Sequence, residues 1–96
     1  MLTHEDYIFS ATLLCNDLAV VSCLRGLAWH CQTDGNKMIS WGNVKEKDWR
    51  RDGCKVTFHF SQLNYRDNFL LRANEIFGTA YEVAGTSNND PAKRAT

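Results

Sequence analysis

Residues 54–60 alternate between apolar and polar side chains without interruption. The apolar positions are Val56, Phe58 and Phe60, and the polar positions between them are Lys55, Thr57 and His59. Because successive side chains of a β-strand point to opposite faces, this pattern predicts a strand with one buried and one open face. A strand of this kind belongs to a sheet that is covered on one face only, so the segment predicts an α+β domain.

Three further segments are predicted as strands, namely residues 7–14, 36–44 and 79–84. The first is rich in β-forming residues and places Phe9, Ala11 and Leu13 on one face. In the second, Ile39 and Trp41 share a face.

Two segments are predicted as helices because apolar residues recur at spacings of three and four. The first is capped by Asn16 or Asp17 and ends near residue 33, and the second begins at a Ser61 cap and ends at Gly78. The first apolar stripe comprises Val20, Leu24, Leu27 and Cys31, widened by Val21 and Ala28. The second comprises Tyr65, Phe69, Ala73 and Ile76.

The resulting order is β-α-β-β-α-β, which predicts a split, ferredoxin-like sandwich. Its four-stranded antiparallel sheet would carry both helices on one face. An alternative is an α+β fold in which the first or last segment does not join the sheet. Residues 1–84 form the predicted single domain, and residues 85–96, which lack an apolar pattern, form a predicted flexible tail.

The charge balance bears on the class of partner. Eleven basic and eleven acidic residues give a formal net charge of zero. Proteins that bind mainly to a phosphate backbone usually carry a strong basic excess, so the balance argues against that class while allowing a local basic patch.

The compartment is predicted from the N-terminus and the cysteines. The chain begins with an acidic segment that lacks the basic and apolar regions of a secretory signal. The longest aliphatic run, residues 18–21, is far too short to span a membrane. We therefore predict a cytoplasmic protein whose four cysteines, Cys15, Cys23, Cys31 and Cys54, are reduced thiols.

No pattern indicates catalysis, a cofactor or a metal. The cysteines lack the close pairs that are typical of structural zinc sites. Cys54 and His59 are five positions apart. Because this offset is odd, the two side chains point to opposite faces of one strand and cannot form a catalytic pair. Glycine-rich phosphate-binding motifs are also missing. The sequence thus predicts a protein that is not an enzyme and has no cofactor or metal.

The segment from residue 45 to 55 holds five basic and three acidic residues around one tryptophan. Tryptophan and arginine are the side chains that most often anchor protein interfaces, so we predict partner binding here. The residues concerned are Lys45, Lys47, Trp49, Arg50 and Arg51. Arg25 and Trp29, which lie off the apolar stripe of the first helix, are a second candidate. The alternative is a solvated hairpin whose tryptophan folds back onto the sheet edge.

These features predict a protein-binding module, an inhibitor or adaptor that docks onto an acidic surface of a protein or ribonucleoprotein assembly as a monomer or homodimer. Small size and missing enzyme motifs are typical of phage or mobile-element inhibitors of host defence, anti-CRISPR proteins among them. One alternative is an RNA-binding ferredoxin-like domain, although residues 52–56 do not match the aromatic motif that stacks bases. The other is a small-molecule-sensing dimer that pairs its open sheet face.

Overall fold

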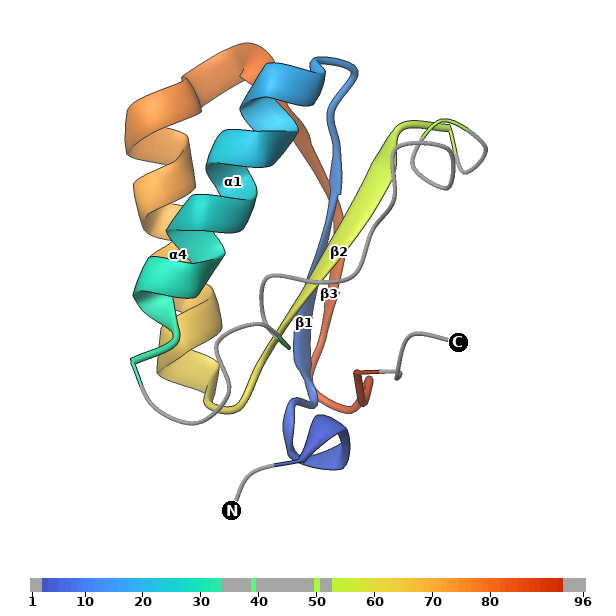
Figure 1. Cartoon of the computed structure of the whole chain (residues 1–96), viewed down its shortest axis with the longest axis vertical. Coiled ribbons are helices and arrows are strands. Elements are labelled where there is room, and N and C mark those ends of the chain that lie inside the picture. The colour runs from blue at the N-terminus through green and yellow to red at the C-terminus, as the bar shows by residue number, and fades with distance from the viewer. Residues whose placement is uncertain (1–2, 34–38, 40–49, 51–52, 93–96) are drawn as a thin grey trace.

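In the computed structural model, which describes residues 3–33, 39, 50 and 53–92, a sheet and a pair of helices form two layers (Figure 1). The sheet comprises β1 (Phe9–Leu14), β2 (Lys55–Phe60) and β3 (Glu82–Ser87). The helices α1 (Leu18–Cys31) and α4 (Leu63–Phe77) lie together on one side of it. Two short 3-10 helices, η1 (His4–Asp6) and η2 (Gly78–Ala80), precede β1 and β3.

The central strand of the sheet is β1, which pairs antiparallel with β2 on one side and with β3 on the other. The strands β2 and β3 are therefore parallel to each other, with β1 between them and α4 connecting them, which is a split β-α-β unit. The predicted core face of β2 is confirmed, because Val56, Phe58 and Phe60 are buried. They lie opposite Leu13, Ala11 and Phe9 of β1, respectively.

The predicted four-stranded sheet is wrong, because the sheet described has three strands. Within the predicted strand 36–44, the described residue is Ile39, which has a helical backbone and packs with Tyr7 and Ala92. The other residues of that prediction lie outside those described. The prediction depended on alternation over few residues, and in that segment Met38, Trp41 and Val44 also recur every third residue, a spacing that suits a helix equally well.

The last strand begins and ends later than predicted. Thr79 and Ala80 belong to η2, and β3 extends through Ser87, three residues into the predicted tail. Beyond it, the backbone amide of Asp90 donates to the Ile8 carbonyl at 2.9 Å, and that of Ala92 donates to the Tyr7 carbonyl at 3.1 Å. Residues 93–96 lie outside those described.

Both helices were predicted, with differences at the cap and in the stripe. The Asp17 side chain caps α1 by accepting a hydrogen bond from the Ala19 amide at 2.9 Å, as predicted. In contrast, the cap residue of α4 is Gln62, and the predicted cap Ser61 instead bonds to Gln32, 29 residues away. The buried residues of α1 are Val21, Leu24, Ala28 and Cys31, and those of α4 are Arg66, Phe69 and Ala73.

One aromatic residue joins the two layers. The ring of Phe69 on α4 lies 5.0 Å from the ring of Phe58 and 5.2 Å from that of Phe60, measured between centroids, and all three side chains are fully buried. Tilted contacts of this kind are favourable for aromatic pairs. The core lies between the two helices and the helix-facing side of the sheet, and Phe69 links α4 to β2 within it. No helix in the described ranges has the length and apolar character required to span a membrane.

Candidate protein-binding surface

The predicted partner-binding residues fall into two groups. Lys45, Lys47, Trp49 and Arg51 lie outside the residues described. Arg50 is described as exposed, with a helical backbone. Arg25 and Trp29 both belong to α1, where a spacing of four residues places them on the same side of the helix.

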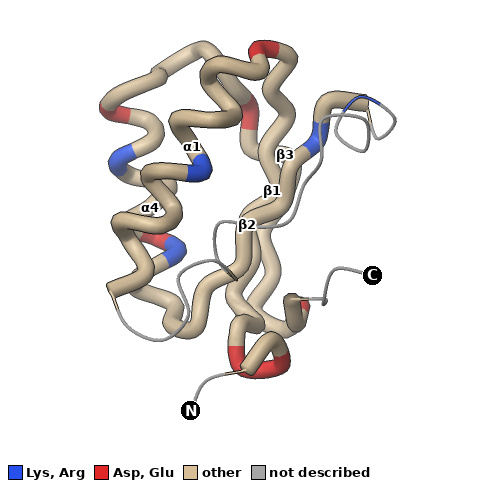
Figure 2. Tube along the Cα trace, viewed as in Figure 1, with Lys and Arg blue, Asp and Glu red and all other residues tan. Residues whose placement is uncertain are grey.

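The exposed residues of α1 include no Asp, Glu, Lys or Arg, although the half-buried Arg25 lies on the same side of the helix as Trp29. These exposed residues are Ala19, Ser22, Cys23, Gly26, Trp29 and His30. Arg25, which is half-buried, is the single Lys, Arg, Asp or Glu of this helix, whereas α4 carries four such residues (Figure 2). Helices at a protein surface usually carry charged or polar side chains on the solvent side, and a helix that is apolar all round is usually buried. The exposed residues of α1 therefore lack the acidic and basic side chains that are usual on a solvated helix, while Ser22 and His30 keep this side partly polar.

The side chain of Trp29 is 45% exposed. In the described part of the chain, every other aromatic side chain is buried or half-buried. The neighbours of Trp29 on the exposed side of α1 are mostly small, which leaves room for another surface to approach the helix closely. A large ring among small neighbours has the form of an interface anchor.

The second helix contributes exposed aliphatic side chains. Leu63, Leu71 and Ile76 are 41%, 58% and 63% exposed. Ile76 was predicted to belong to the buried stripe of α4, and that prediction is wrong. Together with Trp29, these residues make up four of the five large exposed apolar side chains in the described part, the fifth being Val83 on β3. We call Trp29, Leu63, Leu71 and the small exposed residues of α1 the helix-layer surface. Ile76 lies about 140° around α4 from Leu63 and Leu71 and is not part of it.

A buried glutamine aligns the ends of the two helices. Gln32, which follows α1, is fully buried, and its Nε2 donates to Ser61 Oγ at 2.6 Å. The Ser61 backbone amide donates in return to Gln32 Oε1 at 3.2 Å. The C-terminal end of α1 is thereby held beside the N-terminal end of α4, so Trp29 and Leu63 lie at the same end of the helix layer.

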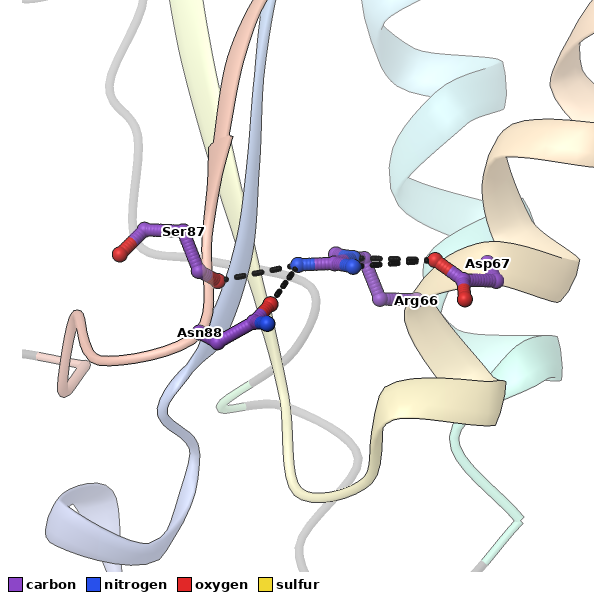
Figure 3. A network of polar contacts seen from close by, with 4 residues as sticks. All are labelled: Arg66, Asp67, Ser87 and Asn88. Atoms are coloured by element: carbon purple, nitrogen blue, oxygen red, sulfur yellow. Dashed lines mark hydrogen bonds and ion pairs between the residues drawn. The ribbon is translucent and has the colours of Figure 1, made fainter.

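A buried arginine connects α4 to the end of β3 (Figure 3). Arg66 Nη1 donates to the Ser87 carbonyl at 3.1 Å and to Asn88 Oδ1, while Nε and Nη2 donate to Asp67 Oδ1 at 3.2 and 3.1 Å. The predicted apolar stripe omitted Arg66, although its spacing of three from Phe69 placed it on the same face. Its role is structural, because each of these contacts is made within the fold.

The face of the sheet that points away from the helices carries polar residues, as predicted, although Ser10 on this face is buried. Thr12 and Thr57 share a hydrogen bond between their hydroxyl groups at 2.9 Å. The aromatic residues of β1 and β2 pack toward the helix layer instead. On the three described strands, the open face therefore presents no aromatic ring on which a base could stack.

A serine, a histidine and an aspartate lie near one another on this open face. Ser10 pairs with His59 across the strands, and His59 Nε2 lies 3.4 Å from Asp90 Oδ2. The three residue types match a hydrolytic triad, but Ser10 is only 2% exposed. A catalytic serine must contact its substrate, and the burial of Ser10 prevents that contact in this structure.

None of the four cysteines is in a disulfide. Cys15 and Cys31 are buried, Cys54 is half-buried and Cys23 is exposed. Burial raises the pKa of the Cys31 thiol above its ordinary value of 9.0, and the nearby positive charge of Arg72 opposes this shift in part. Across the described ranges, no three His, Cys, Asp or Glu side chains are grouped so that they could hold a metal ion.

Comparisons with protein-family models, with curated proteins and with solved structures find no match to this chain.

Proposed function

We propose that this chain is a non-enzymatic protein-binding module that docks through its helix-layer surface onto a larger protein assembly, as an inhibitor or adaptor. The observation that carries this proposal is the uncharged exposed side of α1, from which Trp29 projects. Binding would bury an apolar side chain that the folded domain leaves in water.

The free energy available from Trp29 is large enough for an anchor. An exposed fraction of 45% of an aromatic side chain that buries about 250 Å² corresponds to roughly 110 Å². At about 25 cal/mol per Å², covering this area is worth about 3 kcal/mol before the costs of association. That value is in the range expected for an interface hot spot.

The basic segment that precedes β2 supports a second part of the proposal. The five basic residues between positions 45 and 55, Arg50 and Lys55 among them, can attract an acidic surface over a distance of about one Debye length. Attraction of this kind raises the association rate more than it slows dissociation. We therefore propose that the basic segment steers the encounter and that Trp29 anchors the complex.

The rival functions have less support. An RNA-binding domain of ferredoxin-like type stacks bases on rings of its open sheet face, whereas the rings of β1 and β2 point into the core. A sensor dimer that pairs open sheet faces would bury Lys55, which is exposed, together with the polar row of Thr12 and Thr57.

A site-specific cross-linking experiment tests the proposal. A photoreactive phenylalanine analogue would replace Trp29 in one variant and Glu82, an exposed residue of β3 that belongs to neither proposed binding segment, in a matched control. A protein captured at position 29 and not at position 82 would be identified, purified and titrated against the wild-type chain, Trp29→Ala and Glu82→Ala. We expect Trp29→Ala to weaken binding by about 30-fold or more, which corresponds to about 2 kcal/mol, with an unchanged melting temperature.

Three results would contradict the proposal. Equal binding by the wild-type chain and Trp29→Ala would show that the partner surface lies elsewhere, and Trp49→Ala with Arg50→Ala would then be tested in the same titration. Collapse of the melting temperature in Trp29→Ala would make Trp29 a core residue. Retention of nucleic acid at low salt, with a steep loss as salt rises, would favour the RNA-binding alternative.

A further inference from the structure

Two cysteines that are far apart in the sequence face each other at the end of the sheet. The pairing of β1 with β2 ends with Leu14 opposite Lys55, and the next pair in the same register is Cys15 and Cys54. The backbone amide of Cys15 donates to the Cys54 carbonyl at 2.9 Å, so the two chains remain in contact at this position. Residues that lie directly opposite each other in an antiparallel pair have Cα atoms about 4.5–5.5 Å apart, within the range of about 4.4–6.8 Å that disulfides require.

The side chains of this pair enter the same apolar cluster. Cys15 is 3% exposed and belongs to the main core, and Cys54 is half-buried and packs against that core. Cys54 has a φ of 65°, a conformation that non-glycine residues rarely adopt. It follows Gly53, whose φ is 74°, so the chain turns sharply just before β2. This turn places Cys54 against the core and directly across from Cys15, whose thiol donates to the Asp17 carbonyl at 3.5 Å.

We propose that Cys15 and Cys54 form an oxidisable dithiol that a low-molecular-weight disulfide, such as oxidised glutathione, converts into an intramolecular disulfide. The half-buried Cys54 would lose its proton to solvent, and its thiolate would attack one sulfur of the oxidant, which releases one small thiol and leaves a mixed disulfide on Cys54. The Cys15 sulfur would then attack the Cys54 sulfur and form the intramolecular disulfide, while the Cys15 proton passes to the second small thiolate, which leaves as a thiol. In sum, two protein thiols are oxidised and one small disulfide is reduced to two thiols.

The other two cysteines are poorly placed for this reaction. Cys23 and Cys31 lie two turns apart on α1, about 12 Å along the helix axis, which is too far for a disulfide between them. Cys31 is buried beside Arg72, whereas Cys23 is exposed. Oxidation of Cys23 would therefore stop at a mixed disulfide with the small thiol.

The proposed bond would join the connection between β1 and α1 to the turn that leads into β2. It would close a loop from residue 15 to residue 54, which contains all of α1. Closing a loop of this length restricts the unfolded chain and stabilises the folded one. We expect oxidation to raise the melting temperature by about 5 °C or more.

The test oxidises the folded full-length chain with oxidised glutathione, blocks the remaining thiols and maps the peptides by mass spectrometry. We expect a peptide pair that joins Cys15 to Cys54 and a loss of two hydrogen masses from the intact chain, apart from any glutathione on Cys23. The matched variant Cys23→Ser should form the same bond without an adduct. In Cys54→Ser, Cys15 should remain a thiol and oxidation should leave the melting temperature unchanged.

The proposal is overturned if glutathione remains on Cys54 of the wild-type chain or if the mapped bond joins another pair. It is also overturned if the Cys15–Cys54 bond forms but lowers the melting temperature, because the bond would then have formed from a non-native arrangement. The mapping of the wild-type chain decides the question even if a substitution impairs folding.

Discussion

Truncation of Phe69 to alanine removes the ring that joins α4 to the sheet. Phe69 is fully buried, and its ring contacts two other buried rings, those of Phe58 and Phe60. The substitution therefore removes apolar contacts and leaves a cavity between the two layers. Phenylalanine-to-alanine changes in packed cores cost about 3–5 kcal/mol, and the two ring contacts favour the upper part of that range.

The expected loss is a large fraction of the total stability. At about 0.05–0.15 kcal/mol per residue, a chain of 96 residues has a free energy of unfolding of roughly 5–14 kcal/mol. A loss of about 4 kcal/mol would lower the urea midpoint by about 2–4 M if the free energy of unfolding falls by about 1–2 kcal/mol per M of urea. We therefore expect Phe69→Ala to be partly unfolded without denaturant if the wild-type stability lies at the low end.

Urea unfolding followed by far-ultraviolet circular dichroism measures this loss. The matched control is Leu71→Ala, two residues further along the same helix, where the side chain is 58% exposed. Both substitutions shorten a side chain of α4 to alanine. The difference between their changes in the free energy of unfolding therefore reports the effect of burial, separated from that of helix propensity. We expect Leu71→Ala to change stability by less than about 0.5 kcal/mol.

One outcome would refute the packing argument directly. If Phe69→Ala costs less than about 1 kcal/mol while the unfolding slope is unchanged, the ring does not fill the space between α4 and β2. A larger loss in Leu71→Ala than in Phe69→Ala would mean that the helix presents its other face to the sheet.

Three further predictions follow from the described contacts. Freshly purified protein that is protected from air should show four reactive thiols after unfolding without a reductant; a lower count in a thiol assay would contradict the predicted reduced state. Arg66→Ala should lower the free energy of unfolding, measured in urea, by about 1.5–3 kcal/mol and should speed amide hydrogen exchange in β3, because the Ser87 carbonyl and the Asn88 side chain lose a charged donor. Unchanged exchange rates would show that the Arg66 contacts do not stabilise this strand. Stability should fall as pH rises above about 9, because burial holds the pKa of Cys31 and of Tyr81 above their ordinary values of 9.0 and 10.0, so the unfolded chain loses these protons first. The slope of unfolding midpoint against pH should be shallower in Cys31→Ala, and an identical slope would show that this thiol does not contribute.

Much of the fold was predictable because the signals are local. The alternation of residues 54–60 identified β2 and its buried face, since a strand presents alternate residues to one side. Asp17 and Gly78 marked helix ends because a carboxylate can satisfy the first free amides and glycine accepts a positive φ. Each of these signals depends on residues within one or two turns of the chain.

The errors arose where distant residues compete with local preferences. Serine is a common helix-capping residue, but the Ser61 hydroxyl group accepts a hydrogen bond from Gln32, which follows the other helix. Ile76 follows the apolar period of α4 and yet is exposed, because periodicity does not tell how far the sheet extends beneath a helix. Arg66 follows the same period and is buried, because the end of β3 and Asp67 provide acceptors for its guanidinium group.

The candidate surface was predicted in part. The sequence indicated Trp29 as a residue off the apolar stripe of its helix, and helical geometry is enough to place such a residue away from the core. The joint surface with α4 required the packed structure, because it depends on which sides of two helices face the sheet and on the Gln32–Ser61 contact that aligns their ends.

The sequence by itself therefore determined both helices, three of the strands, the buried face of β2 and an exposed tryptophan, since these follow from backbone periodicity and capping over a few residues. Only the tertiary structure decided the strand order, the burial of Arg66 and the meeting of Cys15 with Cys54. These features depend on register and packing between segments more than twenty residues apart. Contacts of that range are selected by the free energy of the whole fold, which no single segment specifies.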